Sequence, residues 1–237
     1  MNDAPPFVRF GLAHAAVLAA TAAAAVGLAL LVRRRPRLAP IVRLGLILAL
    51  IGFTIAYLRA VAGEGRISVW DVVPLHLCDF LILVAAFALA TLEPTACELL
   101  YFWGGTGTLL ATLTPDLRED WPDWRFVVYF GLHVTVVVAA AVVVFGLGRR
   151  PRPGAAGRVL LLTNAYAAVV GVVDGLWGMN FLYLREKPWA PTLLDWLGPW
   201  PVYILAVEAL ALVLFLLLAL PFDPALRHRL RTRLRVD

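Results

Sequence analysis

Charged residues are scarce in this chain of 237 residues, and cysteine and lysine are almost absent. Charged side chains make up 16% of the sequence, whereas soluble domains carry about 25%. Hydrophobic residues make up 62%, and the mean hydropathy is +0.83. These values exclude a disordered chain, a collagen and an ordinary soluble enzyme. They predict a polytopic membrane protein with a single integral membrane domain over residues 1–237.

The cysteines and the basic residues exclude further classes of protein. Cys78 and Cys97 lie inside or beside apolar runs, so the chain has neither a disulfide framework nor zinc-finger spacing. Lys187 is the single lysine, and the arginines form short clusters between apolar runs. Such clusters orient membrane proteins, so we expect no nucleic-acid partner. The first apolar run is long enough to span and is followed by arginines at 33–35, which argues against a cleaved signal peptide.

Several apolar stretches are long enough to cross the hydrocarbon core, which takes about 20 residues. Helices are the expected form, because backbone polar groups in lipid must be satisfied within the segment. We therefore predict an all-α bundle of about seven transmembrane helices. They are expected at 10–32, 41–62, 70–91, 95–113, 125–147, 158–178 and 200–220.

The distribution of arginine and lysine predicts the orientation of the bundle. With the N-terminus outside, 14 basic residues lie on the inner side and seven on the outer side. This excess predicts a multi-pass protein with an outer N-terminus and a cytoplasmic C-terminal tail. The predicted outer side also holds tryptophans of the kind that form interfacial belts. These are Trp70, Trp121, Trp124, Trp189, Trp196 and Trp200.

Ionisable residues inside the predicted spans are candidates for function, because they are expensive in a membrane. Counted from the outer helix ends, Cys78 and His133 both lie about 12 Å deep at 1.5 Å per residue. Most of the other ionisable residues also fall in the predicted outer half, which indicates a single cavity there. The full set is His14, Asp71, His76, Asp79, Glu98, His133, Asp174 and Glu208.

The densest group of polar residues is His76, Cys78 and Asp79, which follow Pro74. His76 and Asp79 are three residues apart and are expected to share a helical face, where the carboxylate can hold the imidazole in one tautomer. Cys78 becomes a nucleophile if a base takes its proton, and His133 at matching depth is the candidate base. The alternative is structural: a buried cysteine often acts as a small hydrophobe, and the other groups form interhelical hydrogen bonds.

Three functions are compatible with these residues. The first is a lipid-active acyltransferase with Cys78 and His133 as nucleophile and base. The second is a metal-dependent intramembrane hydrolase that uses His76, Asp79, His133 and a carboxylate from Asp174 or Glu208. The third is a transporter or sensor in which the same groups bind or relay a polar ligand. The glycine-rich run at 104–107 is not a phosphate loop, because no Gly-Lys-Ser/Thr follows it.

Four short motifs together resemble a known family. They are Pro-Leu-His-Leu-Cys-Asp at 74–79, Thr-Pro-Asp-Leu at 114–117, the single His133, and Gly-Met-Asn-Phe-Leu-Tyr-Leu at 178–184 with Lys-Pro at 187–188. They resemble the YwaF-like bacterial integral membrane proteins, which group with the transmembrane protein 164 family. The resemblance covers about residues 40–220.

The resemblance implies a multi-helix protein of the bacterial plasma membrane and an activity. Eukaryotic members are described as acyltransferases that place polyunsaturated acyl chains on ether phospholipids, through a cysteine nucleophile and a histidine. Cys78 and His133 are the matching positions, with His76 and Asp79 beside them. We expect membrane lipids as partners, no organic cofactor and no metal in this reaction. The residues expected to contact the substrate are Asp174, Asn180, Glu208 and Thr112.

Overall fold

The computed structural model describes residues 5–63, 65, 68–188 and 193–226. Trp189 and the C-terminal arginines from 227 onward lie outside this range. Within it, the chain is helical, and the one extended contact is an isolated bridge between Pro6 and Glu119. The chain divides into two compact units, Met1–Arg149 and Arg150–Asp237. Each unit is described separately below.

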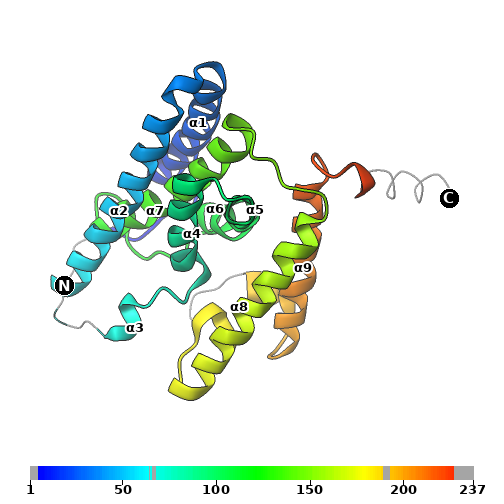
Figure 1. The fold of residues 1–237 in the computed structure, drawn as a ribbon. Coiled ribbons are helices and arrows are strands. Elements are labelled where there is room, and N and C mark those ends of the chain that lie inside the picture. The colour runs from blue at the N-terminus through cyan, green and yellow to red at the C-terminus, as the bar shows by residue number, and fades with distance from the viewer. Residues whose placement is uncertain (1–4, 64, 66–67, 189–192, 227–237) are drawn as a thin grey trace. The chain divides into compact units, whose positions relative to one another are not determined.

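The first unit consists of helices joined by short turns (Figure 1). Two of its segments, η2 and η3, are π-helical turns that continue an α-helix, and η1 is a short 3₁₀ turn. In chain order the elements are α1 (Leu12–Arg34), η1 (Pro36–Leu38), α2 (Ala39–Gly63), α3 (Val69–Val72), α4 (Leu77–Thr91), α5 (Pro94–Trp103), η2 (Gly104–Thr108), α6 (Leu109–Leu113), α7 (Trp124–Ala141) and η3 (Val142–Gly146).

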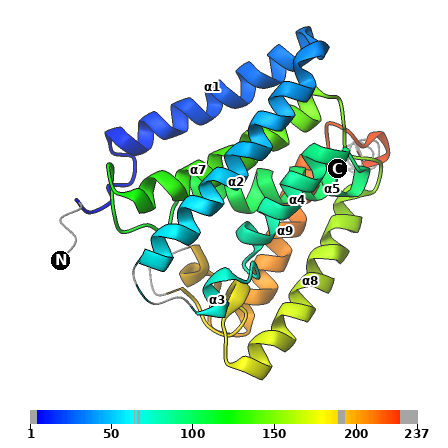
Figure 2. The same cartoon turned by 60° about the vertical axis from the view of Figure 1, so that its left-hand side comes forward.

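Helix α7 is the central helix of the first unit. It contacts α1, α2, α4, α5 and α6, and Figure 2 shows it running alongside α1 and α2. In the most apolar window of α7 and η3, 56% of residues are buried, against 17% for α1 and 11% for α2. One contact is very close: a Cβ added at Gly131 of α7 would lie 2.4 Å from the ring of Phe53 on α2. Glycine at this position therefore lets the two helices meet.

In the part of the chain that the structure describes, five helical segments are long and apolar enough to cross a membrane, as predicted for a multi-pass membrane protein. They are α1, the run from Pro36 to Gly63, α7 with η3, α8 and α9. Five of the predicted spans coincide with them to within a few residues. Helix α4 is apolar but has 15 residues, and α5, η2 and α6 form one uninterrupted run from Pro94 to Leu113. A total of seven spans remains a prediction.

The predicted helix at 70–91 is broken, which corrects the sequence analysis. Helix α3 ends at Val72 and α4 begins at Leu77. Pro74 explains the break, because proline has no N–H to donate and disfavours the helical conformation of the residue before it. His76 is the N-cap of α4, with extended backbone angles of φ −67° and ψ 144°. His76 and Asp79 therefore do not share a helical face in the way that their spacing predicted.

The N-terminal segment is hydrogen-bonded to the loop that precedes α7. The Phe7 N–H donates to the Arg118 carbonyl at 2.7 Å, and the Asp120 N–H donates to the Pro5 carbonyl at 2.8 Å. The side chain of Asp120 also accepts from the Val8 N–H at 3.2 Å. Residues 5–8 and the α6–α7 loop therefore lie at the same end of the first unit.

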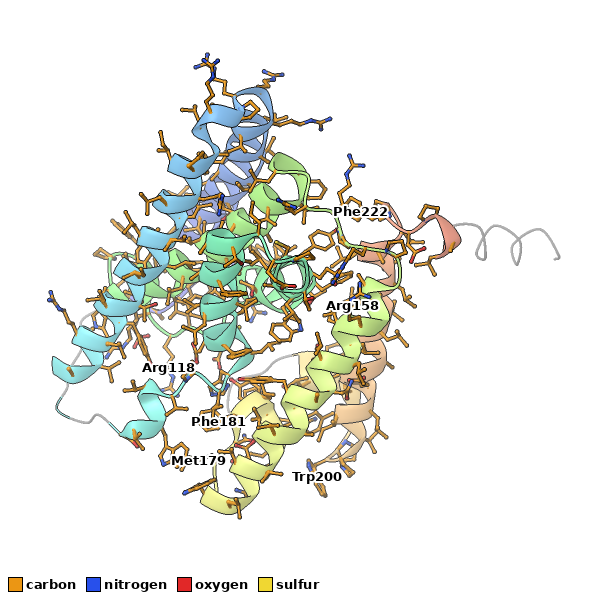
Figure 3. The ribbon with its side chains drawn as sticks, in the orientation of Figure 1. Arg118, Arg158, Met179, Phe181, Trp200 and Phe222 are labelled. Carbon is orange, nitrogen blue, oxygen red and sulfur yellow. The ribbon has the colours of Figure 1, made fainter. Side chains whose placement is uncertain are left out.

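The second unit contains α8 (Ala155–Trp177), η4 (Phe181–Tyr183), η5 (Leu193–Leu197) and α9 (Val202–Ala219). Helices α8 and α9 pack against each other. Figure 3 shows Met179 and Phe181 at one end of α8 and Arg158 at the other. Large apolar side chains such as Leu161 and Leu205, each 71% exposed, lie on the outside of this pair, as expected for helices that contact lipid.

Candidate functional site in the first unit

His133 lies on the central helix and has one free ring nitrogen. Its Nδ1 is 2.8 Å from the Tyr129 carbonyl oxygen, and its ring stacks on the Tyr129 ring at 4.2 Å between centroids. A carbonyl only accepts, so Nδ1 carries the hydrogen and the neutral ring has its lone pair on Nε2. Nε2 has no hydrogen-bond partner among the described residues. The backbone thus holds His133 in the tautomer of a general base.

Two contacts set the level of His133 along the bundle. A Cβ added at Gly104 would lie 3.4 Å from the Ala140 side chain, and the Tyr129 hydroxyl donates to the Ala111 carbonyl at 3.0 Å. The two helices run in opposite directions between these contacts. His133 therefore lies level with the middle of the stretch between Gly104 and Ala111, which is the C-terminal part of η2.

The N-terminal turn of α4 reaches the same level. A Cβ added at Gly107 of η2 would lie 3.9 Å from Leu77, the first residue of α4. Cys78 follows, and it shares a helical face with the buried residues Leu81, Ala85 and Leu89. The thiol is thus on the side of α4 that packs into the first unit, where α4 contacts α7 and η2. The fold brings the start of α4, η2 and the middle of α7 together.

The two cysteines differ in accessibility. Cys78 is half-buried, and Cys97 on α5 is 2% exposed. Neither thiol is hydrogen-bonded to any residue that the structure describes. Of the two, Cys78 is therefore the thiol that a substrate reaches more easily.

His76 and Asp79 interact with each other through their charges, and Asp79 also acts electrostatically on the Cys78 thiol. Asp79 is exposed and makes no hydrogen bond to either histidine within the described chain. His133 is oriented by the backbone carbonyl of Tyr129 and not by a side chain. Sequence reasoning overlooked Tyr129, although its position four residues before His133 places both on one helical face.

Thr112 and His14 form a separate buried group. Thr112 is completely buried, and its hydroxyl donates to the Thr108 carbonyl at 2.8 Å. Its own carbonyl accepts a hydrogen bond from His14 Nε2 at 2.9 Å. The Phe10 N–H donates to His14 Nδ1 at 3.0 Å, so both ring nitrogens are bonded. The His14 side chain therefore joins α1 to the backbone of α6, and the Thr112 hydroxyl is bonded within its own helical run.

An apolar groove lies on the opposite side of α4 from Cys78. It is lined on α4 by Phe80, Leu83, Val84 and Phe87, and its other wall comes from the start of α5. Phe80 is two residues after Cys78, which is a rotation of about 200° around the helix. The groove therefore does not open onto the face of α4 that carries the thiol.

The second unit holds the remaining predicted substrate contacts. Asp174 is completely buried, and its Oδ1 accepts from the Phe181 N–H at 3.0 Å. Its Oδ2 is the one fully enclosed side-chain oxygen or nitrogen without a partner in the described part of the chain. On the facing helices of this unit, Asn164 donates to Glu208 Oε1 at 2.6 Å.

Asn180 closes the loop that follows α8. Its amide donates to the Glu186 carbonyl at 2.9 Å, and its Oδ1 accepts from the N–H groups of Arg185 and Glu186 at 3.0 and 3.2 Å. The Arg185 guanidinium donates to the carbonyls of Asp174 and Met179 at 3.3 and 3.2 Å. These bonds explain the Met-Asn-Phe motif structurally, since Asn180 holds the loop against the end of α8.

Histidine, cysteine and carboxylate side chains do not gather into a metal site in the residues that the structure describes. No three of them lie close enough together to hold an ion. The hydrolase hypothesis, which needs His76, Asp79 and His133 as joint ligands, gains no support from this geometry.

Comparison with known proteins places the chain in a family. The sequence model of the TMEM164 family matches residues 9–219. An uncharacterized protein of Treponema pallidum (strain Nichols) is 32% identical over 249 aligned positions, which cover 97% of this chain and 95% of that protein. No solved structure shows a significant match. With its several membrane-crossing helices and a family match over most of its length, the chain belongs to the TMEM164 family of membrane proteins.

Proposed function

We propose that this protein is a lipid-active membrane enzyme, a phospholipid acyltransferase that uses Cys78 as nucleophile and His133 as base. One observation carries the proposal: a histidine on the central helix has its Nδ1 bonded to a backbone carbonyl, and its Nε2 has no partner among the described residues. The half-buried Cys78 is on the inner face of the helix that reaches the same level. This pairing agrees with the chemistry that the family resemblance implies.

The reaction proceeds in two halves. Nε2 of His133 takes the proton of the Cys78 thiol, and the sulfur attacks the carbonyl carbon of an acyl ester. The C–S bond forms, the ester C–O bond breaks, and the lysolipid alkoxide leaves with the proton from His133. In the second half the hydroxyl of an acceptor lipid gives its proton to His133 and attacks the thioester. The new ester bond forms, the C–S bond breaks, and the proton returns to sulfur.

We further propose seven transmembrane helices, with the N-terminus outside and the C-terminus in the cytoplasm of a bacterium. The basic residues favour this orientation by 14 to seven. The bonds between residues 5–8 and the 118–120 loop require both segments on one side, which agrees with four crossings between them. In this orientation Cys78 and His133 lie in the outer half of the bilayer. The assignment of Asp174, Asn180, Glu208 and Thr112 as substrate contacts stays a prediction from the sequence.

The test is a search for the acyl-enzyme. The purified full chain in lipid nanodiscs is given a phospholipid with an isotope-labelled acyl chain and a lysophospholipid acceptor. Intact mass is expected to show one acyl group that hydroxylamine removes, and peptide mapping is expected to place it on Cys78. Cys78→Ala should abolish both the adduct and acyl transfer, and His133→Ala should slow them by about 10²–10⁴.

The matched control is Cys97→Ala, which should retain adduct and transfer because Cys97 is buried in α5. A folded wild-type protein without adduct or transfer would overturn the proposal. So would full transfer by Cys78→Ala, or loss of the adduct in Cys97→Ala alone. If a chelator stops transfer or hydrolysis, the assignment changes to a metal-dependent reaction.

A further inference from the structure

The π-helix η2 contains a threonine that differs from its neighbours. Thr106 and Thr112 each donate their hydroxyl to the carbonyl four residues earlier, at 2.6 and 2.8 Å. Thr108 makes no such bond, and its hydroxyl is not hydrogen-bonded to any described residue. In the π-helical turn, the carbonyl four residues before it belongs to Gly104, and this carbonyl accepts the Leu109 N–H instead.

The hydroxyl of Thr108 is buried but not completely enclosed by protein atoms. Thr108 is 2% exposed. In the described chain, the single side-chain oxygen or nitrogen that is both fully enclosed and without a partner is Asp174 Oδ2. The Thr108 hydroxyl also has no partner, so it is not fully enclosed and accounts for part of the 2% exposure of this residue. A buried hydroxyl without a partner costs free energy unless something outside the chain accepts its hydrogen. Local π-helical turns of this kind occur frequently at functional sites.

The position of Thr108 joins it to the candidate site. It lies about one turn of the π-helix after Gly104, which packs against Ala140 and Val136 of α7, so Thr108 also faces α7. The contacts of Gly104 and Ala111 place this part of η2 level with His133. A donor without a partner therefore lies on the helix that faces the proposed base.

We propose that Thr108 is a further catalytic residue, which donates a hydrogen bond to the carbonyl oxygen of the ester that Cys78 attacks. The inference rests on the proposed acyl transfer. When the Cys78–carbon bond forms, the carbonyl electron pair moves onto this oxygen, and a fixed hydroxyl stabilises the negative charge. The charge returns to the carbonyl when the leaving alkoxide departs, so Thr108 keeps its proton throughout.

Threonine-to-valine substitutions test this role, because valine keeps the shape and removes the hydroxyl. Thr108→Val is expected to slow formation of the Cys78 acyl-enzyme by about 10²–10³, the usual loss for one oxyanion donor. Thr108→Ser should restore most of the rate. The controls are Thr106→Val and Thr135→Val, whose hydroxyls bond to the carbonyls of Phe102 and Gly131. Both should acylate at close to the wild-type rate.

Alkylation of Cys78 by iodoacetamide separates catalysis from a structural effect. This reaction also forms a carbon–sulfur bond, with iodide as the leaving group, but no charge develops on a carbonyl oxygen. Thr108→Val should therefore be alkylated like the wild type, whereas His133→Ala should be alkylated more slowly. The Thr108 assignment fails if Thr108→Val acylates normally, if Thr106→Val is impaired equally, or if acylation and alkylation fall together. A wild type that never acylates Cys78 instead removes the proposed function itself.

Discussion

Two regions of the first unit are each built around a histidine, and they use it in opposite ways. At the start of α1, His14 is completely buried, surrounded by the rings of Phe7, Phe10 and Phe130, and bonded at both ring nitrogens. In the middle of α7, His133 is half-buried and bonded at Nδ1 alone. The hydrogen is on Nε2 in the first ring and on Nδ1 in the second.

The comparison shows what separates a structural histidine from a candidate base. Both histidines lie in apolar helices, and both were functional candidates from the sequence. Satisfied nitrogens leave His14 no atom for a substrate, because each of its nitrogens has a backbone partner. The difference is the free Nε2 of His133. It can be tested by replacing each histidine and comparing the effects on stability and on transfer rate.

The largest expected effect comes from replacing each histidine by alanine and measuring both stability and rate. His14→Ala should lower the free energy of unfolding by about 3 kcal/mol, because it leaves a cavity and unpaired backbone groups. Its transfer rate per folded molecule should stay near that of the wild type. His133→Ala should lose rate with little change in stability. Thermal unfolding in detergent and the acyl-transfer assay measure the two quantities. A large rate loss in His14→Ala would break the comparison.

A smaller effect is expected at Gly131, two residues before His133. An added Cβ would lie 2.4 Å from the Phe53 ring, so Gly131→Ala should force α2 and α7 apart and destabilise the fold by about 1–3 kcal/mol. Phe53→Leu in the same chain should recover part of this loss by removing the ring. Gly157→Ala, where no atom lies within 4 Å of the added Cβ, is the control. Equal destabilisation by both glycine substitutions would contradict the close contact.

The smallest effect is expected from Tyr129→Phe. This change removes the hydroxyl that donates to the Ala111 carbonyl but keeps the ring on which His133 stacks. Interhelical hydrogen bonds in membrane proteins contribute about 1 kcal/mol or less, so the stability loss should be of that size. The transfer rate should fall little, because the Tyr129 carbonyl still holds Nδ1. A rate as low as that of His133→Ala would assign the phenol itself a part in the reaction.

Hydropathy predicted the fold more fully than the site. Long apolar runs coincide with α1, α2, α7, α8 and α9, because lipid demands the same composition along each span. The break before Leu77 was missed, because the predicted helix at 70–91 followed the apolar run as a whole and one proline changes the hydropathy of that run very little. His133 was identified because an ionisable residue stands out in an apolar helix. The unbonded hydroxyl of Thr108 lies in a local π-helical turn, which residue types alone do not reveal.

The central place of α7 has a consequence for biosynthesis. Helices α1 and α2 pack mainly on α7, yet α7 is the last long helix of the first unit to leave the ribosome. Until then α1 must stay in the bilayer with His14 lacking the ring of Phe130, and α2 must stay there with Phe53 lacking its position against Gly131. We therefore expect α1 and α2 to stay loosely associated until residues 124–146 are synthesised and pack between them.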